Sequence, residues 1–170
     1  MEKPFRIEKM DSFKVIGYKI ETTNQKQEGR HVIPEFWEEF RKQQLIERLL
    51  PLMNSKPYGI LGVNVYNVDT DSRRFDYYIA AASTQPVPES MVAYTIPAAT
   101  WAIFPCTPET IAKTEVQAIM KWLPKFKYKP INSGYITGRM KAGAPDIEYY
   151  GEDDYAEVWV AVIILVLFLF

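Results

Sequence analysis

Apolar residues in the first half of the chain recur with two different periods, which predict strands on either side of a helix. Residues 5–23 alternate between apolar and polar positions and predict one or two strands. After a polar loop at 24–31, apolar side chains recur at helical spacing over 34–52, a stretch that begins with a proline. Residues 58–68 and 75–82 alternate again around a polar turn, which predicts a β-hairpin.

The same order of elements returns after a proline-rich connector. Residues 92–104 are predicted to be extended, with a bend or bulge at Pro97. Residues 108–123 are predicted to be helical, because Thr-Pro-Glu at 107–109 is typical of a helix start. The residues expected on the inner face of this helix are Ile111, Val116, Ile119, Met120 and Leu123. Residues 146–150 and those from 155 onward complete the pattern as two strands.

Together the two halves predict an α+β fold with a duplicated strand–helix–strand–strand repeat. We expect an antiparallel sheet, two helices and a groove between the repeats, since ligand sites often form where two such units meet. An ordinary α+β sandwich without a groove is the alternative.

Composition narrows the possible functions. The 170 residues fit one domain, and 20 basic against 21 acidic side chains give a net charge of -1, which argues against direct nucleic-acid binding. Cys106 is the only cysteine, so no intramolecular disulfide can form, and a charged start without an apolar signal segment favours the cytoplasm. One histidine and one cysteine do not make a metal site, so we expect neither metal nor cofactor.

The end of the chain is unusual because residues 158–170 contain no polar side chain. This run is too short to span a bilayer as a helix, which takes about 20 residues, so no membrane anchor is expected. We assign residues 1–162 to the domain and 163–170 to an anomalous apolar tail, which should be buried in a cleft or against a neighbouring molecule.

Nine segments, in this order and spacing, resemble the GyrI-like family, the effector-binding domain of AraC-type and MerR-type multidrug regulators. They are FKVIGY (13–18), IPEFWEEF (33–40), YGI (58–60), FDYYIAA (75–81), VPESM (87–91), IPAATWAIF (96–104), WLP (122–124), PDIE (145–148) and EVWV (157–160). The resemblance implies the same duplicated fold, with a ligand groove lined by aromatic residues and containing an acidic one. The chain departs from the family at Ala161, where a proline is usual, and resembles a stand-alone member without a DNA-binding segment.

Glu157 is the leading candidate site residue. Alternation in residues 155–162 puts it on one strand face with Tyr155 and Trp159, and the valines on the other. A carboxylate among aromatic rings is desolvated, so its pKa should rise unless a cation or hydrogen-bond donors compensate. A bound cationic ligand would supply that partner. The resemblance matches Glu157 to the family's pocket glutamate, and the alternative is an exposed strand residue.

The other candidates are a second acid and six aromatic residues. Glu148 follows Pro145-Asp-Ile, and the alternative for it is a surface residue or an ion-pair partner of Arg73 or Arg139. The aromatic candidates are Trp37, Phe40, Tyr66, Trp101, Tyr149 and Trp159.

The sequence and the resemblance favour binding or sequestration of an amphipathic, aromatic or cationic drug-like molecule. One alternative is a hydrolase of cyclopropane-bearing genotoxic compounds, with Glu157 as the catalytic residue. Another is an inhibitor-type protein that interacts with gyrase. The sequence does not choose among these three, and it leaves the oligomeric state open.

Overall fold

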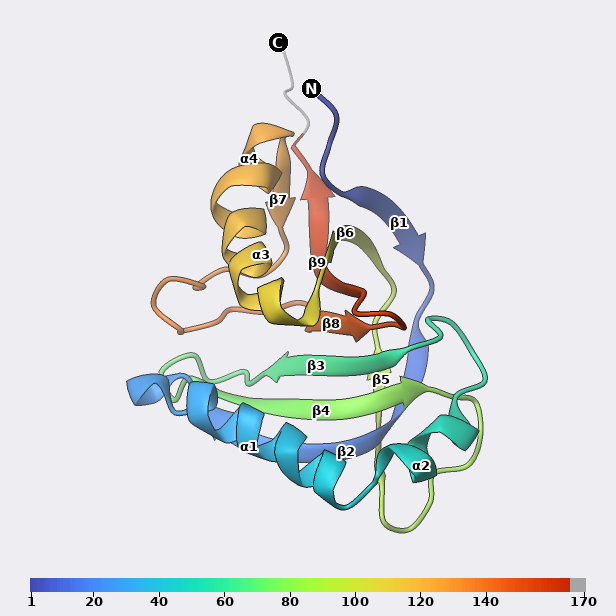
Figure 1. Cartoon of the computed structure of the whole chain (residues 1–170). Helices are drawn as coiled ribbons and strands as arrows, with labels where there is room; N and C mark the ends of the chain where they lie inside the picture. The colour runs from blue at the N-terminus through green and yellow to red at the C-terminus, as the bar shows by residue number, and fades with distance from the viewer. Residues whose placement is uncertain (166–170) are drawn as a thin grey trace.

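The computed structural model describes residues 1–165, which form a curved antiparallel sheet with helices on one face (Figure 1). Within these residues the strands follow the order β1-β6-β9-β8-β3-β4-β2-β5, and β7 pairs with β9. The strands are β1 (Arg6–Met10), β2 (Phe13–Thr23), β3 (Ile60–Tyr66), β4 (Arg74–Ala82), β5 (Val92–Ile96), β6 (Ala99–Cys106), β7 (Tyr128–Pro130), β8 (Asp146–Tyr150) and β9 (Ala156–Ile164). The helical segments are η1 (Gln25–Gln27), α1 (Gly29–Lys42), α2 (Ile46–Leu49), η2 (Leu50–Leu52), η3 (Pro108–Thr110), α3 (Ile111–Gln117), the π-helical η4 (Ala118–Trp122) and α4 (Leu123–Lys125).

The predicted α+β class and the repeat are confirmed. One unit runs from β2 through α1 to the β3–β4 hairpin, and the second runs from β6 through α3 to β8 and β9. The two units meet in the middle of the sheet, where β3 pairs with β8. In Figure 1, α1 lies across one half of the sheet and α3 across the other.

The two units are also linked through two stretches of chain, β1–β2 and β5–β6, each of which bends between its two strands. β1 pairs with β6, and β2, which follows β1 directly, pairs with β5, which precedes β6. Proline at position 97 cannot donate to a strand ladder and lies between β5 and β6, which confirms the bend predicted there within the extended segment 92–104. These bends curl the sheet, so the face without helices becomes concave.

Both helical regions are more broken than predicted. α1 begins at Gly29, inside the expected polar loop, and the region breaks near Gln44, whose φ of 53° is left-handed and ends an α-helix. In the second region a π turn, η4, adds a residue to one turn and shifts the inward face. Val116 and Met120, predicted to be inside, are exposed, and Ala118 is buried instead. Val116 precedes the π turn, so its exposure follows from α-helical spacing, which puts Ile111 and Ala118 on the inward face.

The core is divided by the sheet. Two clusters lie under the helices, one between β6, β9 and α3, the other between β2, β3, β4 and α1. A third, which includes Trp101 and Trp159, fills the concave face. The predicted alternation of β9 is confirmed, because its valines at 158, 160 and 162 pack beneath α3 while Trp159 packs on the concave face.

β9 extends to Ile164 and pairs with β7, so the segment assigned to an apolar tail begins within a strand. Ile163 and Ile164 are exposed there. The rest of the predicted tail, 166–170, lies outside the described residues. Within residues 1–165, none of the helices has the length and apolar character needed to cross a bilayer.

Candidate ligand site around Glu157

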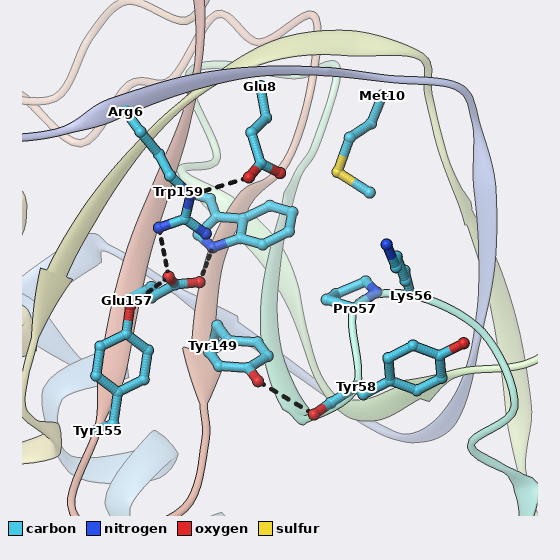
Figure 2. A pocket seen from close by; sticks show the side chains of 10 residues that line it. All are labelled: Arg6, Glu8, Met10, Lys56, Pro57, Tyr58, Tyr149, Tyr155, Glu157 and Trp159. Carbon is cyan, nitrogen blue, oxygen red and sulfur yellow. Dashed lines mark hydrogen bonds and ion pairs between the residues drawn. The ribbon is translucent and has the colours of Figure 1, made fainter.

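A pocket of about 250 Å³ opens on the concave side of the sheet, between β1, the ends of β8 and β9, and the turn before β3 (Figure 2). This is smaller than the roughly 300–1,000 Å³ typical of sites for drug-sized ligands. Its lining residues are Arg6, Glu8, Met10, Lys56, Pro57, Tyr58, Tyr149, Tyr155, Glu157 and Trp159. Three of the predicted site residues are thus brought together here: Tyr149, Glu157 and Trp159.

Glu157 lies at the base of this pocket and is only 3 % exposed. Its Oε2 accepts hydrogen bonds from Nη1 of Arg6 at 2.7 Å and from the hydroxyl of Tyr155 at 2.6 Å. Its Oε1 accepts a third, from Nε1 of Trp159 at 3.0 Å. All three donors converge on the carboxylate in Figure 2.

The pKa of Glu157 is set by the balance between its burial and the donors around it. Burial raises the pKa of the carboxyl, but the three hydrogen bonds and the charge of Arg6 outweigh it, so the net pKa is lowered. The compensating donors that the sequence left open are the side chains of Arg6, Tyr155 and Trp159, so the cation at Glu157 is part of the chain. Glu157 is therefore ionised throughout the neutral range.

Arg6 is a pocket residue that sequence reasoning missed. It pairs with Glu157 and also donates from Nε to Oε1 of Glu8 at 2.9 Å, while its side chain remains 44 % exposed. Burial lowers the pKa of Arg6, but the hydrogen bonds and charges of both carboxylates outweigh burial, so the net pKa is raised. Alternation along β1 puts Arg6, Glu8 and Met10 on the pocket face, and this alternation is the signal that was available.

The aromatic wall of the pocket is held by stacking. The Tyr149 and Trp159 rings lie 6.4 Å apart at an interplanar angle of 17°. The hydroxyl of Tyr149 donates to the carbonyl of Tyr58 at 3.1 Å. Gly59 makes this approach possible, since a Cβ there would lie 2.4 Å from the Tyr149 ring. Trp101 lies behind Trp159, with ring centroids 5.9 Å apart, and is fully buried.

The remaining candidates lie on the helical face of the sheet. Tyr77 donates its hydroxyl to Oε1 of Glu148 at 2.6 Å and accepts from Nε1 of Trp37 at 2.8 Å. Tyr150 donates to the same Glu148 oxygen at 3.1 Å. Phe40 packs edge-on against Trp37. Glu148 is thus held by two tyrosines rather than by either arginine considered from the sequence.

Tyr66 belongs to a second acidic group on this helical face, between the two repeats. Its hydroxyl donates to Oδ2 of Asp146 at 2.6 Å, and the hydroxyl of Tyr135 donates to Oδ1 at 3.0 Å. Burial and the nearby Asp146 and Glu148 raise the pKa of Glu115 on α3. The predicted site residues therefore lie on two different faces of the sheet. Only those near Glu157 on the concave face line the aromatic pocket.

Within the described part of the chain, no group of three or more histidine, cysteine or acidic side chains is arranged to hold a metal ion.

Comparison with known proteins gives a family and a fold. Residues 6–162 match the family model of Cass2, described as an integron-associated effector binding protein. No protein of curated function matches the chain.

The solved structures that resemble the chain share its fold at low sequence identity. The structure of SAV2435 bound to tetraphenylphosphonium has a TM-score of 0.74 and 19% identity, covering 96% of this chain and 94% of that one. A Staphylococcus aureus MU50 protein has a TM-score of 0.71 and 18% identity, with coverages of 95% and 99%. An integron cassette protein from the mobile metagenome of Vibrio cholerae has a TM-score of 0.58 and 21% identity, with coverages of 94% and 95%. Because the family model spans nearly the whole described chain, the protein belongs to the family of integron-associated effector-binding proteins.

Proposed function

We propose that this protein binds aromatic organic cations in the pocket around Glu157. One observation carries the proposal: the buried Glu157 carboxylate already holds a planar cation, the guanidinium of Arg6, at 2.7 Å inside an aromatic-walled pocket. The site thus has the chemistry that a delocalised cationic ligand requires.

The charge and the rings would act together on such a ligand. Glu157 keeps its negative charge at neutral pH because its pKa is lowered. The rings of Tyr149, Tyr155 and Trp159 border the same space, and a cation against an aromatic face gains about 0.5–2 kcal/mol per contact. A ligand that carries both charge and aromatic surface satisfies both features.

Family membership supports a small-molecule ligand, since the family is described by effector binding. The structurally similar SAV2435 was solved with tetraphenylphosphonium, an aromatic cation, which makes this compound the natural first probe.

The hydrolase alternative requires Glu157 to act as a general base. A general base works best when its pKa lies near the operating pH, whereas the pKa of Glu157 is lowered and both its oxygens already accept hydrogen bonds. Binding without turnover is therefore the better supported function. Interaction with gyrase stays a prediction, and no feature of the pocket favours it.

Titration with tetraphenylphosphonium, followed by calorimetry, tests the proposal. Glu157→Gln should raise the Kd by about 10- to 100-fold, the range for a lost charge-assisted contact. Glu152→Gln removes a charge from an exposed residue in the adjacent turn and should leave the Kd unchanged. Equal affinity in the wild type and Glu157→Gln would refute the proposal, as would the absence of saturable binding both in the wild type and in the Arg6→Met variant described below.

A further inference from the structure

The position that a cationic ligand would take at Glu157 is occupied by part of the chain. The Arg6 guanidinium lies between two carboxylates, with Nη1 at 2.7 Å from Glu157 and Nε at 2.9 Å from Glu8. Figure 2 shows the guanidinium between the Glu157 carboxylate and the Glu8 side chain. A ligand that pairs with Glu157 must therefore compete with Arg6.

We propose that Arg6 is a specificity-determining residue, an internal cation that competes with ligands for Glu157 and moves onto Glu8 when an aromatic cation enters. This inference rests on the proposed function of the pocket.

The burial of the three side chains makes the exchange feasible. The Glu157 side chain is 5% exposed and needs a cationic partner at all times, because an unpaired buried charge is strongly unfavourable. The Arg6 and Glu8 side chains are 44% and 45% exposed, so a displaced guanidinium retains both a carboxylate and water. The exchange leaves neither Glu157 nor Arg6 without a partner.

The competition would decide which cations bind. Arg6 is tethered and donates a charge-assisted hydrogen bond, so a small cation such as tetramethylammonium offers Glu157 less than Arg6 already does. A tetraarylphosphonium adds contact with the rings of Tyr149 and Trp159, which Arg6 does not replace. The pocket should therefore select large aromatic cations over small alkylammonium ions.

The size of the pocket agrees with this exchange. At about 250 Å³ it is small for a drug-sized ligand, and Arg6 forms part of its lining. Movement of the Arg6 side chain toward Glu8 would enlarge the space in front of Glu157.

The test is Arg6→Met, which keeps a long unbranched side chain and removes the competing charge. Its matched control is Lys9→Met, on the same strand and with the same change of charge, at a position outside the pocket lining. Each protein is titrated with tetraphenylphosphonium, with tetramethylammonium and with neutral triphenylphosphine oxide. Melting curves check that the variants are folded.

We expect Arg6→Met to bind tetraphenylphosphonium about tenfold more tightly, to gain measurable affinity for tetramethylammonium, and to bind the neutral compound as the wild type does. Lys9→Met should match the wild type with all three. Should Arg6→Met not fold, Arg6→Lys takes its place: it keeps a charge but not the planar fork, and it should bind tetraphenylphosphonium more tightly than the wild type, though by less than tenfold.

Two results overturn the inference and are distinguishable. If removal of Arg6 leaves tetraphenylphosphonium affinity unchanged or weaker while Glu157→Gln weakens it, Arg6 is not a competitor and the proposed function stands. If tetraphenylphosphonium binds neither the wild type nor the Arg6 variant, the proposed function fails and the inference fails with it.

Discussion

The stability of Glu157→Gln shows whether the Glu157 carboxylate is uncompensated or is stabilised by its hydrogen bonds. If the carboxylate were uncompensated, the neutral amide would be equally stable or more stable. In the structure the carboxylate accepts three hydrogen bonds, two of them on Oε2 from Arg6 and Tyr155. An amide nitrogen at that position cannot accept either one, and the remaining amide oxygen still accepts from Trp159.

The loss can be estimated from these contacts. A hydrogen bond to a charged group contributes about 1.5–3 kcal/mol when buried, but the half-exposed Arg6 is screened by water, which reduces its share to below about 1 kcal/mol. Relief of the carboxylate's desolvation offsets part of the remainder. We expect Glu157→Gln to lower the free energy of unfolding by about 1–2 kcal/mol and the Tm by about 2–8 °C for a domain of this size.

The pH dependence of stability provides a second test of the Glu157 contacts. The folded-state pKa of Glu157 is lowered, so its stabilisation is present above the unfolded-state pKa and is lost as the pH falls through the folded-state value. Thermal melts should therefore show the largest gap between wild type and Glu157→Gln near pH 7, narrowing below about pH 4. A variant that melts at or above the wild-type temperature at pH 7 would refute this account.

Two further substitutions test the surroundings. Gly59→Ala places a Cβ 2.4 Å from the Tyr149 ring, so it should lower the free energy of unfolding by about 1–3 kcal/mol in urea and weaken tetraphenylphosphonium binding several-fold; unchanged binding would mean that the ring is not part of the site. Glu115→Gln removes a carboxyl whose pKa is raised by burial and by the neighbouring Asp146, so that the folded state holds a proton which the unfolded state releases. This variant should melt about 1–4 °C above the wild type at pH 8, less so at pH 5, and a lower Tm at pH 8 would contradict the unfavourable burial of that charge.

The fold was largely predictable because its elements are encoded locally. The two periods of apolar residues located both repeats, and alternation in β9 assigned Glu157 and Trp159 to the same face. The π turn in the second helical region was not predictable, since an added residue in one turn depends on packing beneath the helix rather than on its own sequence.

The candidate site was only partly predictable because it depends on strand pairing far apart in the chain. Arg6 reaches Glu157 across 151 residues through the neighbours β1, β6 and β9, an order that no local pattern contains. The two acids show the same limit. Tyr149 pairs with Glu157 and therefore shares its face, whereas Glu148 pairs with Val158 and faces the helices. Both acids sit beside aromatic residues in sequence, and only the register between β8 and β9 separates them.

A crystal structure of the protein with bound tetraphenylphosphonium tests the central claim most directly. The account predicts the phosphonium beside the Glu157 carboxylate, its phenyl rings against Tyr149 and Trp159, and the Arg6 guanidinium on Glu8 alone. A ligand bound instead between α1 and α3 beside Glu148, with the Arg6–Glu157 pair intact, would contradict it.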